Sequence, residues 1–300
     1  MKRAMDLEDE LKIAVSGAVA LREHDRRVLR VTGDDRTTWL NGIVTCDVAK
    51  LLPGAFLYGL AVTQKGRIMA DFNVILEDDA ILVTLPESEA SAVKAAWEKY
   101  LVMEDCELTL DEEAAVWRVV GLQSANVVKA ARALGASTGV QEAGGVVVGK
   151  NADASKLEAA FVSAGAILGS AETIAVLSQL VASPRFGVDF DGTLYPQEAA
   201  LEKRAVSFDK GCYLGQEVVC MLELRGHVKR KLVSLAVDSD HPIEKGMAVT
   251  TIEGEKIGEV TSSAKTPGEG VLAIAMVKAA HMAAKTELRI GEMKAFVRDI

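Results

Sequence analysis

Residues 210–232 read KGCYLGQEVVCMLELRGHVKRKL, and this stretch is the most informative part of the chain. Gly211 and Gly215 bracket Cys212, so the backbone can turn there, and we expect the cysteine on a tight loop rather than inside a helix or strand. Lys210 precedes it, and a nearby ammonium group favours the thiolate, which is the reactive form of cysteine. The pattern therefore indicates a reactive thiol, and the competing interpretation is a small apolar side chain buried in a turn.

The same stretch closes on a run of basic residues, namely Arg225, His227, Lys229, Arg230 and Lys231. Such a cluster can receive an anion, for example a carboxylate or a phosphate. It can equally be a solvated strand edge, where lysines discourage pairing with another chain. Both interpretations remain open from the sequence.

Composition restricts the class of protein. The 300 residues are 49% hydrophobic and 26% charged, which is typical of a globular chain of two domains. A net charge of −9 argues against direct binding of nucleic acid, because such proteins carry basic residues that replace phosphate counterions. No apolar run is long enough to span a bilayer, and the N-terminus turns acidic at once, so we expect a cytoplasmic protein without membrane contact. The four cysteines lack metal-ligand spacing, and we predict no metal site.

Two patterns divide the chain. Up to about residue 232, strands expected at 27–32, 55–63, 67–76 and 80–85 alternate with helical segments, one of them opened by the capping-box pair Ser155 and Glu158. After it, short strands separated by glycine and proline are typical of a small barrel. We therefore predict an α+β domain over residues 1–235 and a β-barrel domain over 236–300.

The motif KGCYLGQE, followed by RG and KR, resembles the folate-binding YgfZ family, a branch of the glycine-cleavage T-protein (aminomethyltransferase) superfamily. Further blocks lie in the order that the superfamily uses. They are RVTGDDR at 30–36, VTCD at 44–47, YGL at 58–60, KGR at 65–67 with DF at 71–72, and GEVTS at 258–262. The resemblance covers essentially the whole chain, and the cysteine motif is its most specific part.

This resemblance implies a three-lobed, aminomethyltransferase-like α+β body with a central hole, plus a small C-terminal β-barrel. It implies tetrahydrofolate or a folate derivative as the ligand, and a role in assembling or maintaining iron–sulfur clusters and, through them, in tRNA modification. The expected partners are iron–sulfur proteins or their assembly machinery. Cys212 is the functional thiol by this resemblance, and the residues expected to shape its loop and bind the ligand are Lys210, Gly211, Tyr213, Gly215, Gln216, Glu217 and Arg225.

The chain departs from its relatives at one ligand position. Relatives carry a glutamate that binds the pterin ring, and here the matching segment places Arg185 at that point. A carboxylate can accept from the adjacent donors of a pterin, whereas arginine only donates. Asp189 or Asp191 can substitute by reaching from the next turn.

Asp71 supports an alternative function. It falls where aminomethyltransferases keep a catalytic carboxylate, and Tyr58 lies in the neighbouring YGL block as a candidate ligand-binding residue. The alternative is therefore an enzyme, a tetrahydrofolate-dependent aminomethyl or methyl transferase that uses Asp71. The plain interpretation of Asp71 is an edge-strand aspartate that faces solvent. A third possibility is a scaffold protein without chemistry.

Overall fold

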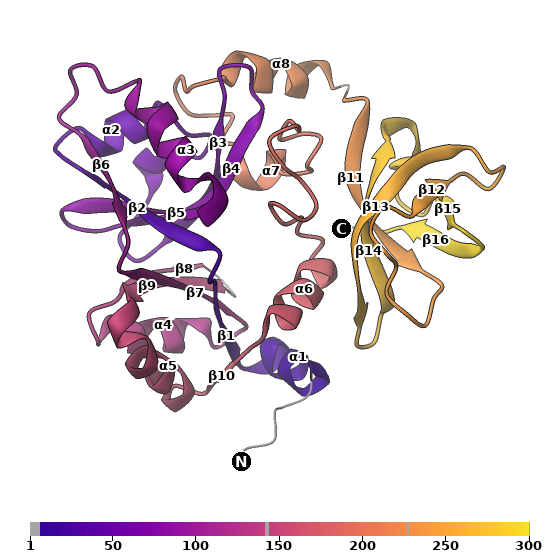
Figure 1. The fold of residues 1–300 in the computed structure, drawn as a ribbon, viewed down its shortest axis with the longest axis horizontal. Coiled ribbons are helices and arrows are strands. Elements are labelled where there is room, and N and C mark those ends of the chain that lie inside the picture. The colour runs from indigo at the N-terminus through magenta and orange to yellow at the C-terminus, as the bar shows by residue number, and fades with distance from the viewer. Residues whose placement is uncertain (1–6, 142–143, 227, 300) are drawn as a thin grey trace. The chain divides into compact units, whose positions relative to one another are not determined.

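The computed structural model describes residues 7–141, 144–226 and 228–299 (Figure 1). The chain forms two compact units. The first comprises Met1–Gln64, Met69–Ala171 and Arg204–Leu214, and the second comprises Lys65–Ile68, Glu172–Lys203 and Gly215–Ile300. No helix among the described residues has the length and apolar character needed to cross a bilayer.

The first unit contains two five-stranded sheets. The strand order of one is β10-β1-β7-β9-β8, and that of the other is β3-β4-β5-β2-β6. Strands β1 and β10 run parallel, whereas the pairs β1–β7, β2–β5, β2–β6, β4–β5, β7–β9 and β8–β9 are antiparallel. Their bounds are β1 Ala18–Arg22, β2 Arg26–Thr32, β3 Phe56–Val62, β4 Ile68–Leu76, β5 Ala80–Pro86, β6 Glu107–Asp111, β7 Ala114–Val120, β8 Ser137–Gln141, β9 Gly144–Lys150 and β10 Ala166–Leu168.

Helices and short turns connect these strands and cover the sheets. In Figure 1, α4 and α5 lie along the sheet that contains β7, β8 and β9, and α3 lies along the sheet of β2 and β5. The helical segments are α1 Leu7–Ser16, α2 Arg36–Asn41, η1 Val48–Lys50, α3 Glu87–Glu98, α4 Ser124–Arg132, η2 Asn151–Asp153, α5 Ala154–Ser163, α6 Ala171–Leu180, α7 Glu202–Ala205, α8 Gln216–Arg225 and η3 Ala279–His281.

Strands β4 and β5 are apolar at nearly every position because both of their faces are covered. On one face Phe72 of β4 meets Trp97 of α3 edge to face, with ring centroids 6.1 Å apart. On the other face Ile75 belongs to a buried cluster that includes Val116 and Val148 of the neighbouring sheet. Because side chains alternate along a strand, Asp71 points to the same face as Ile75, between the two sheets.

The second unit ends in a closed barrel with strand order β11-β14-β13-β12-β15-β16. Its strands are β11 Arg230–Val237, β12 Ala248–Thr250, β13 Lys256–Thr266, β14 Gly270–Lys278, β15 Glu287–Ile290 and β16 Met293–Val297. The α+β fold with a C-terminal barrel is thus as predicted. The predicted boundary at 235/236 falls inside β11, because the basic residues that we assigned to the preceding segment already pair with β14.

Candidate functional site

Cys212 lies in an irregular segment of the first unit and its side chain is exposed. Its neighbour Tyr213 is buried, with 6% of its surface exposed. The last segment of the second unit begins at Gly215, which takes a left-handed conformation with φ of +77° and lies at the N-cap of α8. That conformation favours glycine and explains why the motif has one here. The predicted loop position of the cysteine therefore holds, while the helix that follows was not predicted.

Lys210 is an anchor for this loop. Its Nζ donates to the main-chain oxygens of three residues: Asn41 at 2.6 Å, Val44 at 2.9 Å and Cys46 at 2.6 Å. The ammonium also lies 5.3 Å from the centre of the Tyr213 ring. Burial lowers the pKa of Lys210 to about 8. The lysine of the motif thus ties the loop to residues 41–46, and its predicted influence on the thiol of Cys212 stays a prediction.

Further bonds join the same two segments. The Leu214 amide donates to the Gly42 oxygen at 3.1 Å, and the Ser207 amide donates to the Thr45 oxygen at 2.9 Å. The Thr45 hydroxyl donates to the Ala205 oxygen at 2.6 Å. Residues 205–214 are therefore bonded to residues 41–46 at Ala205, Ser207, Lys210 and Leu214, and the exposed Cys212 lies between the last two of these contacts.

Asp71 lies on the interior strand β4 and only 4% of its surface is exposed, which contradicts the plain interpretation of a solvent-facing edge residue. The Tyr58 hydroxyl donates to Asp71 Oδ2 at 2.9 Å. Arg26 Nη1 lies 2.9 Å from Oδ1 and donates to the main-chain oxygen of Asp71 at 3.0 Å. The carboxylate thus has a phenol and a guanidinium as fixed partners. Burial and the charge of Asp71 raise the pKa of Tyr58 well above its ordinary value.

A second ion pair lies near this group. Arg118 of β7 contacts the buried Glu23, with 2.8 Å between Nη2 and Oε1. The other oxygen of Glu23 is buried and has no hydrogen-bond partner in the described part of the chain. Burial lowers the pKa of Arg26, but Asp71 and Glu23 raise it more strongly, so its net shift is upward. Two carboxylates and two guanidinium groups therefore balance one another between the sheets.

In the second unit, the carboxylate of Asp189 accepts hydrogen bonds from residues whose partners the sequence did not indicate. Its Oδ1 accepts from the hydroxyls of Thr261, at 2.7 Å, and Ser262, at 2.5 Å, and its Oδ2 accepts from the Arg185 amide at 2.9 Å. The threonine and serine of the GEVTS block on β13 are thus bonded to the 185–189 turn. Asp191 uses Oδ1 to accept from the amide and the hydroxyl of Thr193, and these bonds lower its pKa.

The basic run at 225–231 is partly explained by ion pairs. Arg230 contacts Glu198 at 3.3 Å, and Lys231 contacts the buried Glu202. These pairs within the second unit favour a structural role over an anion site for both residues. The side chain of Arg225 and all of His227 lie outside the described residues. Glu217 is exposed in the first turn of α8.

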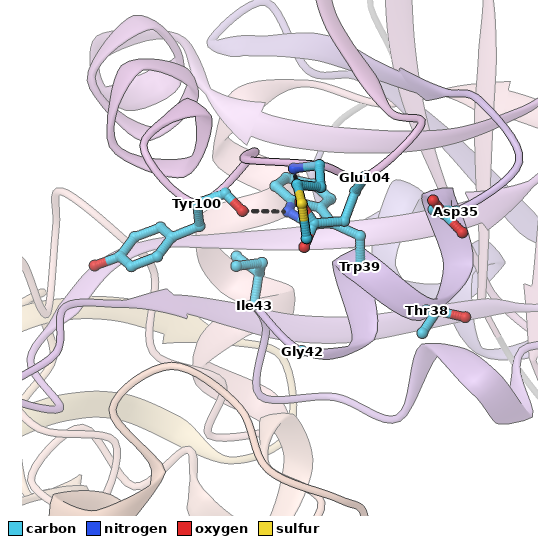
Figure 2. A pocket seen from close by; sticks show the side chains of 8 residues that line it. Asp35, Thr38, Trp39, Gly42, Ile43, Tyr100 and Glu104 are labelled. Atoms are coloured by element: carbon cyan, nitrogen blue, oxygen red, sulfur yellow. Dashed lines mark hydrogen bonds between the residues drawn. The ribbon is translucent and has the colours of Figure 1, made fainter.

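A pocket of about 500 Å³ opens in the first unit between α2 and the segment that follows α3. Its lining comprises Asp35, Thr38, Trp39, Gly42, Ile43, Tyr100, Met103 and Glu104 (Figure 2). The dashed line in Figure 2 marks the bond from Trp39 Nε1 to the Tyr100 oxygen, which is 3.2 Å long. None of these residues was predicted as a site residue, because they are spread over two segments whose proximity depends on the fold.

The predicted site residues lie in three separate regions of the structure. Lys210, Gly211, Cys212 and Tyr213 share the anchored loop, while Tyr58 and Asp71 meet between the sheets. Arg185 lies in the second unit. Sequence reasoning missed Arg26, which carries no motif signal at the start of an ordinary strand. Among the described residues no group of three or more histidine, cysteine, aspartate or glutamate side chains is arranged to hold a metal ion.

Most of the chain is similar to proteins named tRNA-modifying protein YgfZ. The identity is 22% over 255 residues with the protein of Colwellia psychrerythraea, covering 77% of this chain and 76% of the relative. It is 27% over 244 residues with that of Sodalis glossinidius, covering 74% and 72%. The predicted resemblance to YgfZ proteins is confirmed. Residues 230–295 match the glycine cleavage T-protein C-terminal barrel domain.

The fold also matches a solved structure, the glycine cleavage system aminomethyltransferase T from Bartonella henselae. The TM-score is 0.86 at 19% sequence identity, and the match covers 100% of this chain and 90% of that one. The fold is therefore that of the aminomethyltransferase T protein, as the sequence blocks implied. At this identity the likeness establishes the fold and not the reaction.

Proposed function

We propose that this protein is a YgfZ-type accessory protein of the cytoplasm that supports the assembly or maintenance of iron–sulfur clusters and, through them, tRNA modification. Cys212 is its functional thiol, and iron–sulfur proteins or their assembly machinery are its partners. The observation that carries the proposal is an exposed cysteine on a loop that Lys210 anchors by three hydrogen bonds. The similarity to YgfZ relatives, which are named tRNA-modifying proteins, supports the same role.

The other cysteines are poorer candidates for a reactive thiol. Cys46 is buried, and burial raises the pKa of its thiol to about 12. Burial and the neighbouring Asp105 raise the pKa of Cys106 to about 11. Because the thiolate is the nucleophile and the metal ligand, these two thiols react slowly at neutral pH. A lone cysteine such as Cys212 can hold a cluster only by sharing it with another chain or a small thiol.

The Cys212→Ala variant tests this proposal. In a bacterial strain that lacks its own YgfZ, we expect the variant to lose at least about tenfold of the rescue of iron–sulfur enzyme activity, since no other exposed thiol replaces it. The measurement is the activity of an iron–sulfur enzyme in cell extract, together with the modified-nucleoside content of tRNA. Cys220→Ala is the matched control and should rescue fully. Full rescue by Cys212→Ala would contradict the assignment of Cys212 as the functional thiol.

The folate ligand is a separate part of the proposal. The T-protein fold supports it, but the residues at 185–191 do not fit a pterin bound as in relatives. Arg185 can only donate, and both carboxylate oxygens of Asp189 already accept hydrogen bonds. The Nε of Arg185 is buried and has no hydrogen-bond partner in the described chain. No carboxylate among the described residues therefore accepts a hydrogen bond from this atom.

We expect the Arg185→Glu variant to bind tetrahydrofolate at least about tenfold more tightly than the wild type, because a carboxylate can accept from adjacent donors of the pterin. Isothermal calorimetry on the purified proteins measures this difference. Arg185→Gln is the control, since it removes the charge without supplying a carboxylate. Tight binding by the wild type together with weaker binding by Arg185→Glu would contradict the assigned effect of Arg185.

The alternative function is a tetrahydrofolate-dependent aminomethyl or methyl transferase that uses Asp71. The buried carboxylate with its Tyr58 partner favours it. The Arg26 ion pair counts against it, because the guanidinium already occupies Oδ1 of this carboxylate. This alternative requires turnover of a methylamine donor with tetrahydrofolate that the Asp71→Asn change abolishes. Absence of turnover with simple donors leaves the accessory role.

A further inference from the structure

The pocket of Figure 2 is apolar at its base and preformed. Trp39 and Ile43 are each only 6% exposed, and the bond from the Trp39 indole to the Tyr100 oxygen fixes the ring. At the rim, Met103 is 93% exposed, and Val102 beside it is 82% exposed. Exposed apolar side chains next to an apolar pocket are typical of a surface that another molecule covers. A volume of about 500 Å³ admits one large apolar side chain with its flanking backbone.

The rim of this pocket is acidic. Asp35 and Glu104 line it, and the exposed Asp34 and Asp105 are their immediate neighbours. Glu104 accepts two main-chain amides through Oε2, and Asp35 accepts the Asp105 amide through Oδ2. Neither rim carboxylate forms an ion pair with any residue that the structure describes. A cationic group on the occupant would supply the missing partner, whereas a phosphate or an anionic lipid would be repelled.

The nearest cation along the chain does not neutralise this rim. Arg36 donates through Nη1 to the Gly33 oxygen at 2.8 Å and through Nη2 to the Asp78 oxygen at 2.9 Å. Its guanidinium is thus committed to main-chain oxygens. The positive charges of Arg36 and of Lys99, which precedes Tyr100, are still outnumbered by the carboxylates of Asp34, Asp35, Glu104 and Asp105, so the rim keeps a net negative charge.

The pocket adjoins the loop of Cys212 within the first unit. Gly42 lines the pocket and its oxygen accepts the Leu214 amide, while the preceding Asn41 oxygen accepts from Lys210. Cys212 is two residues from Leu214, so their Cα atoms are at most about 7 Å apart. A peptide seated in the pocket can therefore reach the thiol with a few residues of its own chain.

We propose that this pocket docks a partner protein through one apolar side chain flanked by lysine or arginine, and so presents that partner to Cys212. The apolar side chain occupies the space beside Trp39 and Ile43, and the flanking cations pair with Asp35 and Glu104. The inference deepens the proposed function, since it specifies how a client protein is recognised at the thiol. It rests on Cys212 as the functional thiol, but the pocket can be tested without it.

Thiol–disulfide exchange tests the proposal on the whole protein. The probe is a blocked peptide of sequence KLKGC, supplied as its mixed disulfide with 5-thio-2-nitrobenzoate. The Cys212 thiolate attacks the sulfur of the peptide, a protein–peptide disulfide forms, and the coloured thionitrobenzoate thiolate leaves with the electron pair of the broken bond. We expect KLKGC to react at least about tenfold faster than the matched peptides ELEGC and KSKGC, with the advantage falling as salt rises.

Variants with matched controls locate the effect. Met103→Ala and Glu104→Gln should each reduce the advantage of KLKGC by about threefold or more, because each removes one contact of the docked peptide. Leu122→Ala and Glu107→Gln each change an exposed apolar or acidic side chain of the first unit that does not line the pocket, and they should leave the advantage of KLKGC unchanged. Reaction with the symmetrical thionitrobenzoate disulfide reports the intrinsic reactivity of Cys212 and should be equal in all five proteins.

Equilibrium binding separates this proposal from the proposed function. The peptide KLKGS has no thiol, and its binding is measured by the change in tryptophan fluorescence, since Trp39 lines the pocket. Saturable binding that Met103→Ala weakens supports the pocket even if Cys212 proves unreactive or Cys212→Ala rescues the null strain. Equal exchange rates for all three peptides, or binding of KLKGS that the acidic peptide ELEGS matches, would overturn the docking proposal.

Discussion

Replacing Arg26 with methionine is expected to lower the free energy of unfolding by about 3–5 kcal/mol. The change leaves the buried Asp71 without the guanidinium that now lies 2.9 Å from its Oδ1. It also removes the positive charge that Arg26 provides to the nearby carboxylate of Glu23. An uncompensated buried carboxylate is among the few single changes with an effect of this size.

Urea unfolding followed by tryptophan fluorescence measures this effect. Trp39, Trp97 and Trp117 all lie in the first unit, so the signal reports the unit that contains the ion pair. Arg27→Met is a matched control one residue away, since Arg27 pairs with Glu87 at the surface.

For that exposed pair we expect a loss of less than about 1 kcal/mol. The double change Arg26→Met with Asp71→Leu should recover most of the stability, because an apolar pair of similar volume can replace a buried ion pair. If Arg26→Met lowers the free energy of unfolding no more than Arg27→Met does, the Arg26–Asp71 pair does not contribute the expected stability.

Replacing Lys210 with methionine is expected to lower the free energy of unfolding by about 3 kcal/mol. Methionine keeps much of the length of the side chain but donates no hydrogen bond, so the main-chain oxygens of Asn41, Val44 and Cys46 lose their common donor. An acceptor left unpaired inside a protein costs about 1 kcal/mol or more. The exposed Lys50 pairs with Asp47, and Lys50→Met should change the stability by less than about 0.5 kcal/mol.

The pH dependence of this change has a defined sign. The pKa of Lys210 falls from its ordinary value of 10.5 to about 8 in the folded chain. Below pH 8 the amine is charged in both the folded and the unfolded chain, so the cost of burying the charge is fully present. Between about pH 8 and 10.5 the folded chain loses its proton first, and its stability rises relative to that of Lys210→Met. A difference between the two proteins that stays constant or falls over this window would contradict the assigned shift.

Local patterns determined much of the secondary structure. The alternation at 27–32 and the apolar runs at 67–76 and 80–85 correspond to β2, β4 and β5. The pattern of apolar residues along a strand follows directly from which of its faces are buried. The capping box was wrong. Asp153 rather than Ser155 lies at the N-cap of α5, and the Glu158 carboxylate instead accepts from the Trp117 indole at 3.2 Å. A hydrogen bond between residues 41 positions apart thus takes the place of the expected capping interaction.

The sequence by itself determined the family resemblance, the barrel and the loop position of Cys212, since each depends on residue types at short, fixed spacings. Only the tertiary structure decided what the polar side chains of the motifs bond to. Lys210 was expected to act on its neighbour but reaches oxygens more than 160 positions away, and Asp189 bonds to hydroxyls more than 70 positions away. The physical reason is that a buried charge must find its partner wherever the packed backbone supplies one, and that choice depends on how the strands stack rather than on their order in the chain.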